Sequence, residues 1–161
     1  MKLAAIDHHQ ASTSIWMLDS GASNHYTSNC NCFVTFESTK PVPIESASSL
    51  IYGCGKGDVV LHLSCGTISI PDVIYVPSIV KTVNLISIGQ LEARGIEFTM
   101  KNGKCFVWKQ GSLWAIATRI NNVYLLCEID DTHMNQCLVS FLSSASFPAL
   151  SSEKDPRRVD T

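Results

Sequence analysis

The chain has 161 residues and a mass of 17.6 kDa, which is enough for one domain and too little for a multidomain enzyme. Hydrophobic residues make up 45% of it, so it can build a core and is not globally disordered. With 12 basic and 14 acidic residues its net charge is −2. It lacks the positive charge on which phosphate binding depends, and we expect no direct nucleic-acid partner.

Hydrophobic runs in the sequence are short. The run at residues 73–76 is typical and falls far below the roughly 20 apolar residues that cross a bilayer, so we expect no membrane partner. The chain reaches Asp7 before an apolar stretch of signal-peptide length develops, which predicts a cytoplasmic protein. Its seven cysteines are too few for a small disulfide-bonded scaffold, and we expect most of them to be reduced, buried thiols.

The two ends of the chain differ in composition from its middle. Residues 1–14 are mixed and polar, and residues 129–161 are rich in Ser, which predicts a flexible N-terminal segment and a C-terminal tail of low order. Between them, residues 15–128 are rich in β-branched and aromatic residues and are regularly interrupted by Gly, Asn and Pro. This pattern is typical of a folded domain made of many short strands.

The first predicted strand is the apolar run at residues 15–18, which ends at a polar turn beginning with Asp19. Residues 42–52 then predict a hairpin, and alternating apolar residues predict a second hairpin over 59–70. A further buried strand covers residues 73–76. Three alternate glycines are expected to bend the strand between the two hairpins: Gly53, Gly55 and Gly57.

The second half of the sequence predicts one short helix followed by more strands. Asn84 is a good N-cap residue, and apolar residues follow it three apart until Gly95, which is placed to end a helix. Asn102-Gly103 is the strongest signal for a two-residue hairpin turn. The whole pattern predicts an all-β protein, a closed barrel with one short helix, whose last strands are at 96–100, 105–108, 113–118 and 123–127.

The most informative motif is Asp19-Ser20-Gly21, directly after an apolar strand. The strand fixes the backbone, Gly21 permits a tight turn near a neighbouring chain, and Ser20 can form a hydrogen bond to a partner loop. Such a loop aims a carboxylate at a fixed point, as aspartic proteases require. A plain turn at the end of a strand uses the same residue types, so the tripeptide alone does not decide between the two.

Together with four other segments, this motif makes the sequence resemble a known family. The family is the aspartic protease of copia-type LTR retrotransposons, the β-barrel domain of their Pol polyprotein. The resemblance covers about residues 15–128. The matching segments are 16–25 (WMLDSGASNH), 53–57 (GCGKG), 71–77 (PDVIYVP), 83–91 (VNLISIGQL) and 95–98 (GIEF).

The resemblance implies a retropepsin-like β-barrel that hydrolyses peptide bonds of a Gag-Pol polyprotein as a homodimer, in the cytoplasm or in retrotransposon particles. It implies no cofactor and no metal. Asp19 becomes the catalytic acid, with Ser20 and Gly21 completing its loop. Ile88 and Gly89 support that loop from behind. The flap that closes over substrate falls on residues 42–52; its tip lacks the Asp-Gly pair of typical members and consists of Ala47, Ser48, Ser49 and Leu50.

The chemistry of peptide hydrolysis explains the need for two chains. One carboxylate takes a proton from the attacking water while a second, protonated carboxyl polarises the amide carbonyl. Two such groups about 3 Å apart share one proton, because like charges so close do not both ionise. No other Asp in the sequence is followed by Ser or Thr and then Gly. The second acid is therefore expected from a second copy of Asp19 across a two-fold axis.

Two alternatives stay open at this point. The first is a zinc site, although the Cys-x-Cys spacing is unusual for structural zinc and the fourth ligand is far away in the sequence. The second is a β-barrel without catalytic activity that acts as a dimerisation or peptide-binding module. The candidate zinc ligands are His25, Cys30, Cys32 and Cys54.

Overall fold

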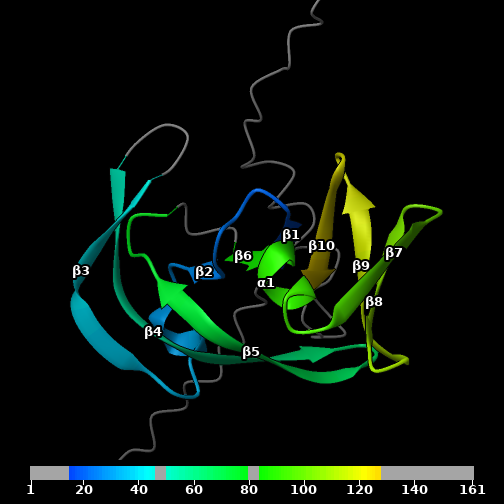
Figure 1. Ribbon diagram of the computed structural model, residues 1–161, viewed down its shortest axis with the longest axis horizontal. Coiled ribbons are helices and arrows are strands. Elements are labelled where there is room, and N and C mark those ends of the chain that lie inside the picture. The colour runs from blue at the N-terminus through cyan, green and yellow to red at the C-terminus, as the bar shows by residue number, and fades with distance from the viewer. Residues whose placement is uncertain (1–14, 46–49, 80–83, 128–161) are drawn as a thin grey trace, which may run out of the picture.

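A computed structural model describes residues 15–45, 50–79 and 84–127 of the chain (Figure 1). Within these ranges the protein is all-β, with ten strands in one sheet and little helix. No helix in this part of the chain is long and apolar enough to cross a membrane. The predicted N-terminal segment and C-terminal tail lie outside the described residues. The elements are β1 (Ile15–Asp19), β2 (Tyr26–Thr27), the 3-10 helix η1 (Cys30–Cys32), β3 (Glu37–Glu45), β4 (Leu50–Leu63), β5 (Gly66–Tyr75), β6 (Asn84–Ser87), α1 (Ile88–Glu92), β7 (Ile96–Lys101), β8 (Lys104–Lys109), β9 (Ser112–Ile120) and β10 (Val123–Cys127).

The sheet is open, so the predicted closure into a barrel is not confirmed. Its strand order is β3-β4-β5-β2-β6-β1-β10-β9-β8-β7, which makes β3 and β7 the edges. We call β3 to β5 one wing of the sheet and β7 to β9 the other. In Figure 1 β3 lies on the left and β7 to β9 on the right, while the long strands β4 and β5 run from the left beneath the central strands toward β9. Side chains from both wings pack into one hydrophobic cluster. The wings are thus joined by packing, and backbone hydrogen bonds do not close the sheet within the described residues.

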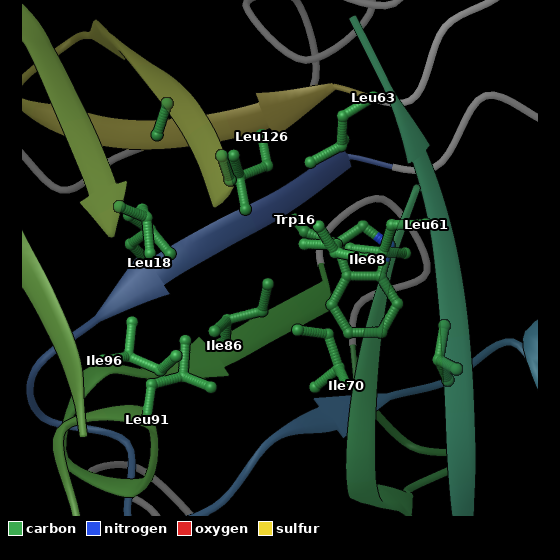
Figure 2. Packing of buried hydrophobic residues seen from close by; sticks show 14 of the residues in the cluster. Trp16, Leu18, Leu61, Leu63, Ile68, Ile70, Ile86, Leu91, Ile96 and Leu126 are labelled. Atoms are coloured by element: carbon green, nitrogen blue, oxygen red, sulfur yellow. The ribbon is translucent and has the colours of Figure 1, made fainter. Parts of the chain in front are cut away.

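The core lies between the two wings and surrounds β1. Trp16 and Leu18 alternate onto one face of this strand, and Trp16 is completely buried. Figure 2 shows Trp16 among Leu61, Ile68 and Ile70 of the β4–β5 hairpin. Full burial of one such apolar side chain stabilises a fold by about 1.5–3 kcal/mol. This packing fixes the position of β1, whose C-terminal residue, Asp19, begins the loop that runs to His25 and is called the Asp19 loop below.

Three two-residue turns connect the strands in the described second half of the chain, residues 84–127, and the first of them, Asn102-Gly103, is as the sequence predicted. Asn102 and Gly103 have φ of 52° and 73° and join β7 to β8, as a type I′ turn requires. Gln110-Gly111 joins β8 to β9, and Asn121-Asn122 joins β9 to β10, again with positive φ at both positions. Each hairpin therefore has its register fixed by a two-residue turn.

The predicted helix begins later than expected, because residues 84–87 form a strand. This strand, β6, pairs in parallel with β1, and α1 covers only the five residues that follow. Asn84 Nδ2 donates to the Ile15 carbonyl at 3.0 Å, and Asn84 Oδ1 accepts from Thr27 Oγ1 at 2.7 Å. This buried amide connects three strands instead of capping a helix. Gly95 follows the helix with φ of +77°, in agreement with its predicted role.

Two of the alternate glycines on β4 make room for a neighbouring segment. A Cβ on Gly57 would collide with the carbonyl of Thr35, and a Cβ on Gly55 would collide with the ring of Phe36. The segment before β3 therefore crosses β4 at a distance that only glycine permits. The backbone approach explains these glycines better than the predicted bend alone.

Candidate active site

Asp19 is the last residue of β1 and lies beside the start of α1. In the parallel pairing of β1 with β6 it is opposite Ser87, the residue that precedes the helix. Asp19 is half-buried. No Lys or Arg in the described part of the chain forms an ion pair with it. The carboxylate therefore lies at the edge of the core, on a strand that Trp16 and Leu18 hold in place.

The turn after Asp19 orients its carboxylate. The backbone N–H of Gly21 donates to Asp19 Oδ1 at 2.7 Å. A Cβ on Gly21 would lie 3.3 Å from the same oxygen, which is a tight contact, so glycine keeps this side of the carboxylate uncovered. Ser20 is exposed next to it, and its hydrogen bond to a partner loop stays a prediction.

Gln90 connects the far side of the Asp19 loop to α1. Its Nε2 donates to the Ser23 carbonyl at 3.2 Å and to Asn24 Oδ1 at 2.7 Å. The hydroxyl of Tyr26 lies 3.1 Å from Ser23 Oγ and accepts from Asn24 Nδ2 at 3.3 Å. Gln90 is not among the residues that the sequence predicts for the site, although its place directly after Ile88-Gly89 indicates that it belongs to the same structural unit.

His25 ends the loop and is completely buried. Its Nδ1 accepts from the backbone N–H of Ser87 at 3.0 Å. Ser87 Oγ in turn accepts from the backbone N–H of Gln90 at 3.2 Å and so caps α1. Burial is the main cause that lowers the pKa of His25 to about 4; the charge of Arg94 lowers it further and that of Asp72 opposes this. His25 is therefore neutral near pH 7, as an acceptor at Nδ1 must be.

Three charged residues connect β5 with the end of α1. Arg94 Nη2 donates to Asp72 Oδ2 at 2.8 Å, and Lys56 Nζ lies 3.6 Å from Asp72 Oδ1. The hydrogen bond from Arg94 is the main cause that holds the pKa of Asp72 below its ordinary value, and the charge of Lys56 adds to it. All three side chains are substantially exposed, so the group contributes little stability. Two of the three charges also act on His25 in opposite directions: Arg94 lowers its pKa and Asp72 raises it.

Two surface depressions lie on either side of the start of α1. The larger, of about 460 Å³, has Gly89 in its wall. A Cβ on Gly89 would meet nothing closer than Ser87 Oγ at 4.0 Å, so packing within the described chain does not require this glycine. The smaller depression, of about 250 Å³, brings Ile88 together with Asp19 and Ser20. The rest of its wall consists of Met17, Leu18, Met100, Asn122, Val123 and Tyr124.

The predicted flap corresponds to the hairpin of β3 and β4. Leu50 opens β4 with 55% of its surface exposed, and Val42 and Tyr52 are exposed as well. The rest of the predicted tip, Ala47, Ser48 and Ser49, lies outside the described residues. A depression of about 170 Å³ lies along the hairpin and is lined by Thr39, Val42, Ile44, Gly53, Gly55, Lys56 and Ile74.

The alternative zinc site is not formed in the described ranges. They contain no group of three or more His, Cys, Asp or Glu side chains that could hold a metal ion, and Nδ1 of His25 already accepts a backbone N–H. The expectation of mostly buried thiols is wrong for the cysteines described. Cys30 and Cys65 are exposed, Cys32 and Cys54 are half-buried, and Cys105 is buried.

Comparison with known proteins was made for the whole chain. A family model described as the Pol polyprotein, beta-barrel domain, matches residues 16–96. No curated protein and no solved structure matches. The matched region begins in β1 and ends at the first residue of β7, so it contains the Asp19 loop, the β3–β4 hairpin and α1. Because this match covers half of the chain, the chain belongs to the family of Pol polyprotein beta-barrel domains.

Proposed function

We propose that this chain is the aspartic endopeptidase of a copia-type retrotransposon Gag-Pol polyprotein and acts as a homodimer. The observation that carries the proposal is the setting of Asp19. It ends a strand buried in the core, its carboxylate accepts the Gly21 N–H, and it faces the β6–α1 junction. Membership in the Pol family supports the same reading.

The proposed mechanism uses two Asp19 carboxyls, one from each copy of the chain. They share a proton, and the ionised one removes a proton from the attacking water while the protonated one polarises the substrate carbonyl. The Gly21 N–H holds Asp19 Oδ1 and leaves Oδ2 for the partner and the water. Three further hydrogen bonds hold the loop and keep the carboxylate from relaxing toward solvent: two are donated by the Gln90 side chain, and the third joins the Ser87 N–H to His25.

The lining of the Asp19 depression supports the proposal of a second copy. Among its described residues Asp19 is the only acid. The catalytic partner must then come from another chain, and a two-fold axis brings a residue to its own copy. The exposed apolar side chains of the β3–β4 hairpin, Val42, Leu50 and Tyr52, suit it to cover an extended peptide in such a dimer.

Peptide cleavage by the purified chain tests this function. The probe is a peptide library from a digested proteome at about pH 5, where a carboxyl pair sharing one proton is active. Mass spectrometry of the products should show new termini that a statine-type inhibitor prevents. Asp19→Asn should abolish them, whereas Glu97→Gln, a matched change on an exposed residue, should not. Equal inertness of the wild type and Asp19→Asn, with both dimeric, would instead favour the non-catalytic dimerisation or peptide-binding module.

A further inference from the structure

The burial and the hydrogen bonds of His25 indicate a role inside the fold and not at the surface of the loop. Its side chain is completely buried, and its Nδ1 accepts the Ser87 N–H at 3.0 Å. Its own carbonyl accepts from the Ile74 N–H at 2.8 Å, so its backbone is fixed to β5 as well. With Nδ1 an acceptor, the neutral imidazole carries its proton on Nε2. That nitrogen is buried without a hydrogen-bond partner among the described residues.

The atom that His25 binds belongs to the junction that supports the catalytic loop. Ser87 pairs with Asp19 across β1 and β6, and it also caps α1 through its hydroxyl. The N–H of a residue at a helix start has no partner within the helix, so a side chain has to supply one. The hydrogen bond that the Ser87 N–H donates to His25 therefore fixes the end of β6 and the start of α1, next to Asp19.

The surroundings of His25 oppose a second proton on its ring. Arg94, after α1, repels a positive charge, and Asp72 on β5 attracts one but is engaged by Arg94 and Lys56. β6 contributes no ionisable residue, and β1 contributes none besides Asp19. A proton on Nδ1 would point an N–H at the Ser87 N–H and break the contact. The hydrogen bond can exist only while the imidazole is neutral.

We propose that neutral His25 is a positioning residue that latches the β6–α1 junction through the Ser87 amide, and that its protonation opens this latch and loosens the Asp19 loop. The effect on cleavage rests on the proposed function; the latch itself does not. The consequence is an acid limit for cleavage that belongs to His25 and not only to the Asp19 pair. The burial that lowers the pKa of His25 to about 4 places this limit on the acid side of the working range.

Two variants separate the hydrogen bond from the rest of the side chain. In His25→Asn the amide Oδ1 takes the place of Nδ1 and accepts from Ser87 but binds no proton. In His25→Leu the volume is similar and the acceptor is lost. NMR of the wild type should show the Ser87 amide resonance moving with the His25 ring as the pH is lowered through about 4. In His25→Asn the Ser87 resonance should stay constant over the same range.

Cleavage of a peptide from the library completes the test. His25→Asn should keep its activity below the pH at which the wild type loses it, and His25→Leu should lose about tenfold or more in kcat at all pH values. A Ser87 resonance that does not follow His25, or an identical acid limit in the wild type and His25→Asn, would overturn the proposal. A Ser87 resonance that follows His25 in a protein without cleavage activity would support the latch and overturn the proposed function.

Discussion

Acid should destabilise the fold through His25, because the folded protein keeps this side chain neutral while the unfolded chain lets it take up a proton. The pKa of His25 is about 4 in the folded protein, against an ordinary value of 6.5. Between these values the unfolded state binds more protons, so the free energy of unfolding falls by about 1.4 kcal/mol per pH unit. The full loss is about 3 kcal/mol, reached near pH 4 and constant below it as far as His25 is concerned.

Urea unfolding at a series of pH values measures this loss, at constant protein concentration because the proposed dimerisation would also affect stability. His25→Asn should remove the dependence between pH 6.5 and about 4, since Asn binds no proton there. Asp72 does not contribute in this interval, because its pKa is lowered below 3.8 and its charge is lost only at lower pH. If the free energy of unfolding changed equally with pH in the wild type and in His25→Asn, the loss of stability in acid would not come from His25.

Three substitutions test other parts of the structure. Gly57→Ala should lower the free energy of unfolding in urea by about 2–3 kcal/mol, because the new Cβ collides with the backbone of Thr35. The control Gly89→Ala should change it by less than about 1 kcal/mol, and equal effects would contradict the close approach of the segment before β3 to β4. Gln90→Ala should lower kcat about tenfold with little change in KM, because the substitution loosens the Asp19 loop and removes no contact with substrate. Unchanged steady-state kinetics would contradict this role of Gln90. Asp19→Asn should shift the urea midpoint very little, because an amide oxygen still accepts the Gly21 N–H; a large loss of stability would give Asp19 a structural role.

Features with a local cause could be predicted from the sequence. The Asn102-Gly103 turn needs positive φ at both positions, and these two residue types supply it wherever they occur. Residues 84–87 were assigned to a helix wrongly, because the partners of Asn84 are far along the chain. Ile15 is 69 residues away and Thr27 is 57 residues away, and no pattern within the segment indicates them.

The same distinction applies to the candidate site. Asp19 and Gly21 are two residues apart and form one hydrogen bond, so a contiguous motif is enough to predict the turn that they form. The contact of His25 with Ser87 spans 62 residues, and that of Gln90 with the Ser23 carbonyl spans 67. Such contacts depend on how β2, β6 and α1 pack together, which the sequence pattern alone does not specify.

Mixing wild-type chain with Asp19→Asn chain tests most directly whether one active site needs two copies of Asp19. The two are mixed in different ratios at one total concentration, high enough for dimers to form, and allowed to exchange before cleavage is measured. If the site is shared, an equal mixture should show about one quarter of the activity of pure wild-type chain at the same total concentration, because about one quarter of the dimers are then wild-type pairs and only these are active. Retention of about one half, in proportion to the wild-type chain present, would mean that each chain acts alone and would contradict the shared site.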